Sequence, residues 1–296
     1  MKQHVNFKEL FYFFIMFLVA LSWGGHANIM KPAMSMMNDP YLWMILQNTP
    51  IVIMLFVYHQ INPIPDFFNR KHIPYAIIIG TLAYGIANPV LALTTHHISV
   101  SYMMLMIGLT SAMTYIVALC FRSESLKLKK IIGVLIAFIA IIYYFRQNLS
   151  FNGIDTWYFI ALLTPMSFGI QNMTIKQWAY HKLDIRGLIF YQSLYSLILL
   201  SAWLFYRPPT TALHTVQAFN VFAYSLLLLL GLSHYCGQYF FYLLVTRVKS
   251  LVYASQASTL AIVFGIVLAT VCFGDPLTYS LMIATALILF AIHLCY

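Results

Sequence analysis

The side chains able to do chemistry inside the apolar segments of this 296-residue chain are amides, histidines and tyrosines. All seven carboxylates fall in loops or at segment ends: Glu9, Asp39, Asp66, Glu124, Asp155, Asp184 and Asp275. A carboxylate deep in a bilayer is kept for ion coupling or cation binding, so this placement argues against export of cationic drugs. We find no catalytic set such as paired Asp, Ser/His or HExxH in these segments, and no cofactor or metal motif. An enzyme is therefore not expected.

Polar residues inside the apolar segments are candidates for contact with a small solute. Those that we favour are His26, Asn88, Tyr102, Gln171, His234, Gln238, Tyr253 and Gln256. His234 and Gln238 are four residues apart and share a helix face. Hydrogen bonding between helices is the alternative role, which Asn, Gln and His often have in membranes. Because histidine titrates near neutrality, His26 and His234 are also the candidates for a coupling proton.

The elements that must position these residues are membrane spans. The chain is 62% hydrophobic and only 8% charged, whereas soluble domains carry about 25% charged residues. Apolar runs of spanning length predict an all-α polytopic membrane protein with ten transmembrane helices. The approximate cores of these helices are 10 to 30, 41 to 60, 73 to 94, 99 to 121, 130 to 146, 155 to 176, 187 to 206, 219 to 245, 250 to 273 and 277 to 296. Helix kinks are expected at Asn88-Pro89 and Pro165, and Pro50 is a further candidate for a kink.

The net charge of +9 comes from Lys and Arg residues whose positions indicate how the chain is oriented in the membrane. With the N-terminus inside, all Lys and Arg except Lys31, Arg146 and Arg207 fall on the cytoplasmic side of the ten-span layout, which is the bias that sets topology. We expect a multi-pass protein of the cytoplasmic (inner) membrane with both termini cytoplasmic. The basic residues lack a neighbouring base-stacking motif, so the bilayer is the expected partner and nucleic acid is not.

The chain contains an internal repeat. An offset of 145 residues matches Gly24 with Gly169 and Lys31 with Lys176, and an offset of 151 matches Tyr102 with Tyr253. We expect two repeats, 1–150 and 151–296, of five spans each. Because five is odd, the second repeat must be inverted in the membrane, and inverted repeats are a common plan for secondary transporters, with the substrate site between the halves.

Four short motifs resemble those of a known family. Ser22-Trp23-Gly24 followed by Lys31, and Ser167-Phe168-Gly169 followed by Lys176, resemble the WG...K signature of the EamA branch of the drug/metabolite transporter superfamily. Glu124-Ser125-Leu126 and Gly274-Asp275-Pro276-Leu277-Thr278 look like its E-x-L turns. The resemblance covers essentially the whole chain. It departs from the family pattern at Phe168 and Asp275, and in lacking a proline near Leu109-Thr110 and Leu260-Ala261.

The resemblance implies a cavity surrounded by spans 1, 3, 4, 6, 8 and 9, with spans 5 and 10 peripheral and alternating access by rocking. It makes Trp23, Gly24, Lys31, Gly169 and Lys176 a conformational motif. Lys31 and Lys176 are each expected at a helix end, where the dipole favours a cation. Anchoring is the favoured role for both lysines, and attraction of an anionic group is the alternative.

We therefore expect a secondary transporter of a small polar or zwitterionic metabolite, with an amino acid favoured and export the favoured direction. The alternatives are import of a nucleoside or an adenosyl-methionine-like compound, and a non-transport membrane scaffold. The expected partners are the small-molecule substrate and the bilayer, with a coupling proton as a further candidate. The protein is expected to act as a monomer or a weak dimer.

Overall fold

The computed structural model describes residues 7–37, 39–94, 97–148, 156–204, 221–248 and 251–295. These described residues form helices and no strands. Helices separated by no more than one residue stack end to end, which gives ten rods in the predicted order. The predicted repeat boundary at residues 150 and 151 lies outside the described residues.

The first five rods come from the first half of the chain. They are α1 (Phe7–Met37), α2 (Pro40–Ile61), the stack of α3 (His72–Gly80), η1 (Thr81–Ala87) and α4 (Asn88–Thr94), the stack of α5 (Val100–Gly108) and α6 (Thr110–Cys120), and α7 (Leu128–Asn148). The second half supplies the stack of α8 (Thr156–Ala161) and α9 (Leu163–Ala179), then α10 (Ile185–Leu204), α12 (Val221–Arg247), α13 (Leu251–Phe273) and α14 (Tyr279–Cys295).

Seven of these rods, within the described residues, are long and apolar enough to cross a membrane. They are 10–33, 41–61, 72–94, 100–120, 185–202, 221–247 and 254–273. The outer faces carry many exposed large apolar side chains, such as Leu135, Ile139 and Phe222, as lipid contact requires. The multi-pass prediction is confirmed, whereas crossing by α7, α8–α9 and α14 stays a prediction.

Proline accounts for two of the three breaks within rods. The third rod changes to the π-helix η1 just before Asn88-Pro89. The sixth rod breaks after Ala161, four residues before Pro165, where a proline ring clashes with the helix carbonyl. The fourth rod is interrupted at Leu109 although no proline stands there. At Pro50, α2 continues as one helix from Pro40 to Ile61, and a kink there stays a prediction.

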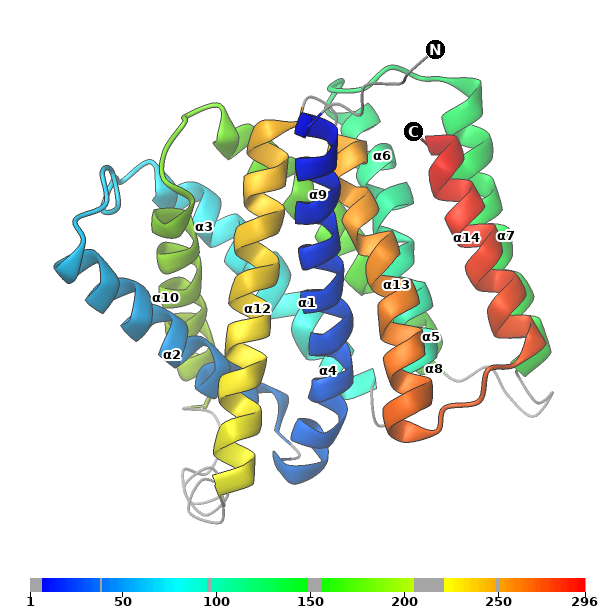
Figure 1. Ribbon diagram of the computed structural model, residues 1–296, viewed down its shortest axis with the longest axis horizontal. Helices are drawn as coiled ribbons and strands as arrows, with labels where there is room; N and C mark the ends of the chain where they lie inside the picture. The colour runs from blue at the N-terminus through cyan, green and yellow to red at the C-terminus, as the bar shows by residue number, and fades with distance from the viewer. Residues whose placement is uncertain are drawn as a thin grey trace.

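The central helices form two packing groups related by the repeat. In the first group α1 packs against α12 and α13, and in the second group α9 packs against η1 and α6. Spans 1, 8 and 9 of one group thus correspond to spans 6, 3 and 4 of the other. Figure 1 shows the paired α7 and α14 at one end of the bundle and the paired α2 and α10 at the other.

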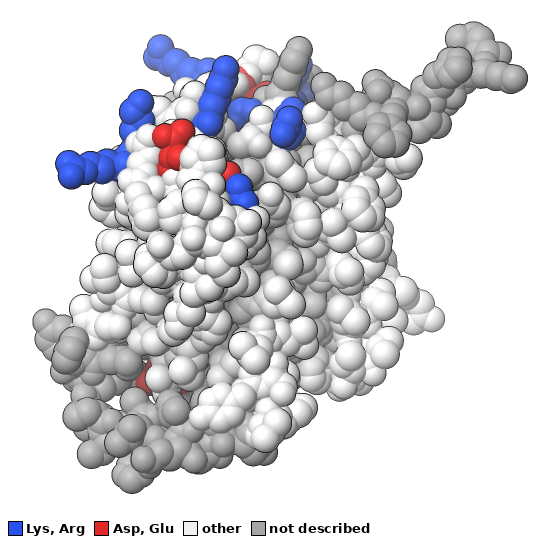
Figure 2. Space-filling model, turned by 60° about the vertical axis from the view of Figure 1, so that its left-hand side comes forward, with Lys and Arg blue, Asp and Glu red and all other residues white. Residues whose placement is uncertain are grey.

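The two ends of the helices differ in charge. α1 begins and α14 ends on the same side of the molecule (Figure 1), and the Lys and Arg side chains visible in Figure 2 gather there. We call this side the basic face. That it faces the cytoplasm stays a prediction, and the charge bias of the loops favours it.

Candidate functional site

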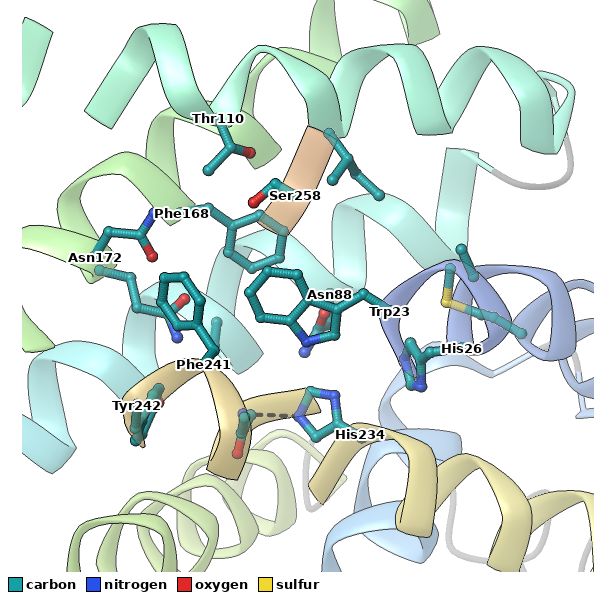
Figure 3. Close-up of a pocket in the computed structure, with 16 residues that line it drawn as sticks. Trp23, His26, Asn88, Thr110, Phe168, Asn172, His234, Phe241, Tyr242 and Ser258 are labelled. Carbon is teal, nitrogen blue, oxygen red and sulfur yellow. Dashed lines mark hydrogen bonds between the residues drawn. The ribbon is translucent and has the colours of Figure 1, made fainter. Parts of the chain in front are cut away.

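A pocket lies between the two packing groups. Its lining comes from spans 1, 3, 4, 6, 8 and 9 (Figure 3), as the family resemblance implies, and consists of Trp23, His26, Ala27, Met30, Ala83, Asn88, Ile107, Thr110, Phe168, Gln171, Asn172, His234, Gln238, Phe241, Tyr242 and Ser258. The empty volume is about 740 Å³, including the part open to solvent.

Aromatic rings form much of the pocket wall. Trp23 and Phe168 occupy matched repeat positions, and both line the pocket. The Trp23 ring lies 5.0 Å from that of Phe241, centroid to centroid, and both rings are drawn at the centre of Figure 3. Such a wall suits a solute with a flat or bulky apolar part.

Three buried polar atoms of the wall have no hydrogen-bond partner among the described residues. They are Gln171 Oε1, Gln238 Oε1 and Thr110 Oγ1, on side chains that are at least nine-tenths buried. A buried polar group without a partner is unfavourable by about 1–3 kcal/mol. Each atom can accept a hydrogen bond, and each belongs to a residue that lines the pocket.

The two histidines meet on the α12 side of the pocket. The ring centroids of His26 and His234 are 5.1 Å apart. His234 Nε2 lies 2.7 Å from Tyr84 Oη, and the Gln238 amide donates to Tyr84 Oη at 3.2 Å. Tyr84 belongs to η1, and π-helical turns are frequent at functional sites. The π-helix thereby carries a buried hydroxyl to the polar cluster of α12.

Tyr242 connects the pocket to the peripheral helix α10. Its hydroxyl donates to Gln192 Oε1 at 2.6 Å, and Gln192 is completely buried. Tyr242 was not among the predicted site residues. The spacing of the sequence could have identified Tyr242. His234, Gln238 and Tyr242 follow one another at intervals of four residues and therefore share one helix face.

The matched glycines of the motif permit close helix packing. A Cβ atom on Gly24 would lie 2.9 Å from the Ala261 carbonyl oxygen and from the Gly265 nitrogen, and one on Gly169 would lie 3.1 Å from the Thr114 nitrogen. Thr114 and Gly265 are themselves matched by the offset of 151. Thus α1 touches α13 and α9 touches α6 at equivalent positions.

The matched lysines make different contacts. Lys176 is in the last turn of α9 and donates from Nζ to the carbonyl oxygens of Val245 and Val248, at 3.3 and 2.7 Å. The expected helix end at Lys31 is wrong, because α1 continues to Met37. Lys31 Nζ instead lies 3.5 Å from Asp275 Oδ1.

Five of the eight predicted substrate residues line the pocket, namely His26, Asn88, Gln171, His234 and Gln238. Tyr102 and Gln256 are not part of the lining. The Tyr102 ring packs edge-on against Tyr158, with centroids 4.7 Å apart. The side chain of Tyr253 lies outside the described residues. Whether any of these residues binds substrate stays a prediction.

The lining also includes residues outside the favoured set of eight, among them Thr110, Asn172, Phe241 and Ser258. Phe168 is the motif partner of Trp23 in the second repeat, and Asn172 is a polar residue of the sixth span beside Gln171. Nothing in the pattern singles out Phe241 among the 23 phenylalanines. Among the described residues, no group of His, Cys, Asp and Glu is arranged to hold a metal ion.

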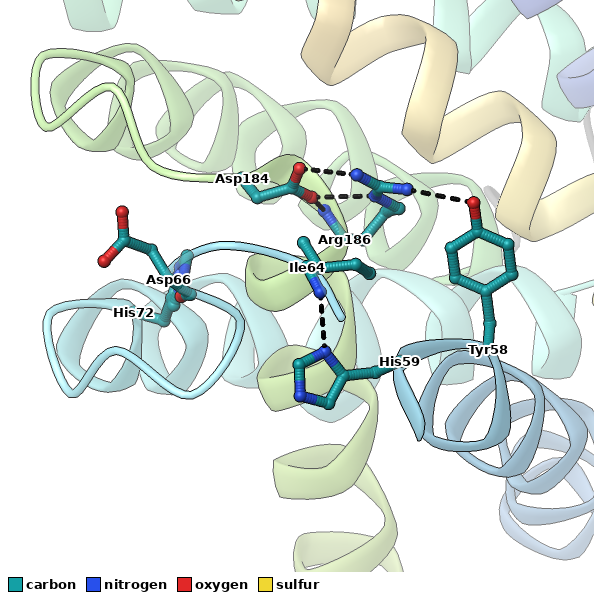
Figure 4. Close-up of polar contacts among 7 residues, drawn as sticks. All are labelled: Tyr58, His59, Ile64, Asp66, His72, Asp184 and Arg186. Carbon is teal, nitrogen blue, oxygen red and sulfur yellow. Dashed lines mark hydrogen bonds and ion pairs between the residues drawn. The ribbon is translucent and has the colours of Figure 1, made fainter. Parts of the chain in front are cut away.

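A separate polar cluster connects α10 with α2 at the basic face (Figure 4). Arg186 Nη2 and Asp184 Oδ2 are 2.8 Å apart, and Asp184 Oδ1 accepts from the Arg186 backbone at the start of α10. Arg186 Nη1 reaches Tyr58 Oη of α2 at 3.5 Å. Burial alone would raise the pKa of Asp184, but the hydrogen bonds and charge of Arg186 outweigh burial and lower this pKa below its ordinary value.

This pKa direction predicts a pH-dependent contribution to stability. A lowered pKa in the folded state stabilises the protein above the ordinary aspartate pKa, and this stabilisation is lost as pH falls through the folded pKa. In detergent, Asp184→Asn is expected to lower the free energy of unfolding by up to about 1 kcal/mol at neutral pH, as for a partly exposed ion pair. The difference from the parent protein should vanish in acid.

The measurement is the melting temperature between neutral and acidic pH for the parent protein, Asp184→Asn and Asp184→Ala. Asparagine keeps a helix-capping oxygen, whereas alanine also removes the cap, which is worth about 1 kcal/mol. A constant difference between the parent protein and Asp184→Asn at every pH would contradict the role of the charge.

Comparisons with known proteins agree with this architecture. The sequence model of the EamA-like transporter family matches residues 10–146 and 155–296. A search of curated proteins finds no match. One solved crystal structure of a protein is similar with a TM-score of 0.67 and 15% identity, covering 95% of this chain and 94% of that chain. At this identity the likeness shows the fold alone.

Proposed function

Because the chain belongs to the EamA-like transporter family of the drug/metabolite transporter superfamily, we propose that it carries a small, net-neutral metabolite with an aromatic or bulky apolar part. An amino acid of this kind is the first candidate. Transport proceeds by alternating access across the cytoplasmic (inner) membrane, and export is the proposed direction.

The composition of the pocket wall carries this proposal. Among the residues that the structure describes, the lining contains aromatic rings, amides, hydroxyls and two histidines, but no Asp, Glu, Lys or Arg. A fully charged solute would lose its hydration without an opposite charge to pair with. An amino acid is net neutral, and its ammonium group can donate to the unpartnered oxygens of Gln171, Gln238 and Thr110, while its apolar side chain packs on the rings of Trp23 and Phe168.

Counterflow in proteoliposomes tests the substrate class. Vesicles loaded with unlabelled phenylalanine, tryptophan or leucine should take up the labelled compound transiently, whereas nucleosides and quaternary amines should give weaker signals. Counterflow restricted to quaternary amines would contradict the proposal, and counterflow restricted to nucleosides would favour the metabolite alternative. Efflux from loaded cells, compared with uptake, tests the direction.

The role of the pocket amides is tested within the same assay by Gln171→Leu. Loss of one hydrogen bond to the solute is worth about 0.5–1.5 kcal/mol, which corresponds to a roughly three- to tenfold higher KM. The matched control is Gln47→Leu, because Gln47 is buried and unpartnered at both amide atoms but does not line the pocket. Equal changes of KM in the two variants would show that Gln171 does not contact the substrate.

A coupling proton is the further candidate partner. His26 and His234 are the titratable imidazoles of the lining, and they stand close enough for one proton to influence both rings. An imposed pH gradient should then drive flux in the parent protein but not in the double variant His26→Gln, His234→Gln. Normal pH-driven flux in the double variant would contradict this role.

A further inference from the structure

The two motif lysines, Lys31 and Lys176, occupy matched repeat positions, but Lys31 contacts its own packing group and Lys176 contacts the other one. Lys176 belongs to α9 in the second packing group, yet it donates to carbonyl oxygens at the C-terminal end of α12 in the first group. It therefore ties the two groups together at the basic face. Among the described residues Lys31 makes no equivalent tie on the opposite face, since it pairs with Asp275, which follows α13 of its own group.

The repeat gives each lysine both kinds of partner. By the offset of 151, Asp275 corresponds to Glu124, and Val245 and Val248 correspond to Thr94 and His97 at the end of α4. Lys31 could thus tie to the α4 end as Lys176 ties to the α12 end. Lys176 could likewise pair with Glu124 as Lys31 pairs with Asp275.

The alternative partner of each lysine lies on a segment close to its own helix. Met173, one helical turn before Lys176, has its sulfur 3.5 Å from Ser123 Oγ, and Ser123 directly precedes Glu124. Glu124 now pairs with Lys130 at 3.0 Å. On the opposite face α1 already contacts α4. The exchange therefore requires side-chain rotation and a relative movement of the groups.

We infer that Lys31 and Lys176 exchange partners during transport and so determine which face of the pocket is closed. We assign the contact of Lys176 with the end of α12 to a state closed at the basic face, in which Asp275 keeps Lys31 away from α4. In the opposite state Lys31 ties to the backbone carbonyls of residues 94 and 97, and Lys176 pairs with Glu124. This inference rests on the proposed transport function and assigns the gating residues of that function.

One contact at Asp275 is independent of the exchange. Ser101 Oγ of α5 donates to Asp275 Oδ2 at 3.2 Å, where spans 4 and 9 pack against each other. Spans 4 and 9 are repeat equivalents of each other, so the exchange as proposed keeps these two spans in contact in both states. Ser101 thus holds the carboxylate in place, and the lysines are the members that change partner.

The exchange makes opposite predictions for two pairs of variants. Lys176→Gln removes the tie at the basic face, and Asp275→Asn releases Lys31 to tie the opposite face, so both variants should open the pocket toward the basic face. Lys31→Gln and Glu124→Gln remove contacts that form only in the opposite state. Both variants should therefore keep the pocket closed at the basic face. If the two lysines only anchored the helix ends, the variants would not fall into two pairs with opposite effects on the pocket.

Side-specific labelling of a pocket cysteine measures this without a substrate. The reporter is Ser258→Cys in a protein whose four cysteines are replaced by serine, probed with a membrane-impermeant maleimide added to either face of oriented vesicles. We expect Lys176→Gln and Asp275→Asn to raise the labelling rate from the basic face about tenfold and to lower it from the other face. Lys31→Gln and Glu124→Gln should do the reverse or leave the distribution unchanged.

Further variants separate gating from misfolding. Lys176→Arg keeps the cationic donor and should restore the parent labelling pattern, and the double variant Lys31→Gln, Lys176→Gln should lie between the two single variants. If both single lysine variants shift labelling in the same direction, or if neither shifts it, the exchange is wrong. Because labelling needs no solute, a failed counterflow screen with the expected labelling pattern would overturn only the proposed substrate class.

Discussion

Gly24→Ala is expected to destabilise the protein, whereas Gly25→Ala, one residue further along α1, is not. A Cβ atom on Gly24 would lie 2.9 Å from two backbone atoms of α13 and 3.0 Å from Phe264 Cβ. Backbone cannot rotate away as the end of a side chain can, so α1 and α13 must separate. Overpacking of this kind is worth about 1–3 kcal/mol.

Gly25 is the matched control, because a Cβ atom there meets nothing within 4 Å. Alanine at this position should be neutral, or stabilising by up to about 1 kcal/mol through helix propensity. The measurement is the melting temperature of both variants in one detergent, with Gly169→Ala as the repeat equivalent of Gly24→Ala. Equal melting temperatures for Gly24→Ala and Gly25→Ala would show that close packing at Gly24 is unimportant.

The contact at Gly24 also indicates how far the sequence predicts the fold. The number and order of the rods follow from apolar run length, since a bilayer requires long apolar helices. The small residues of the motif predict close approach of helices in general. They do not say that Gly24 meets α13, because α13 lies more than 200 residues away and no local pattern encodes the partner.

The candidate site was predictable where a polar residue interrupts an apolar span. His26, Asn88, Gln171, His234 and Gln238 line the pocket for this reason. Apolar and aromatic lining residues give no such contrast, so Phe241 could not be distinguished from a lipid-facing phenylalanine. The π-helix at Tyr84 was likewise hidden, because it depends on the hydrogen-bond pattern before Pro89 and not on composition.

Trp23→Ala is expected to abolish most discrimination between aromatic and small amino acids. Burying a large apolar group against the indole is worth about 1.5–3 kcal/mol, so the ratio of counterflow for phenylalanine to that for alanine should fall roughly 10- to 100-fold. Trp23→Phe should retain most of the ratio, because phenylalanine occupies the matched position 168 on the opposite wall.

The ratio is the appropriate measurement because Trp23 also supports the fold. Its ring packs on Phe241 and covers Gly237, where a Cβ atom would lie 2.5 Å from the indole, so truncation will lower the amount of folded protein. That loss reduces transport of both amino acids equally and cancels in the ratio. An unchanged ratio in Trp23→Ala, with reduced flux of both compounds, would assign Trp23 to helix packing alone and would place the aromatic part of the solute elsewhere in the pocket.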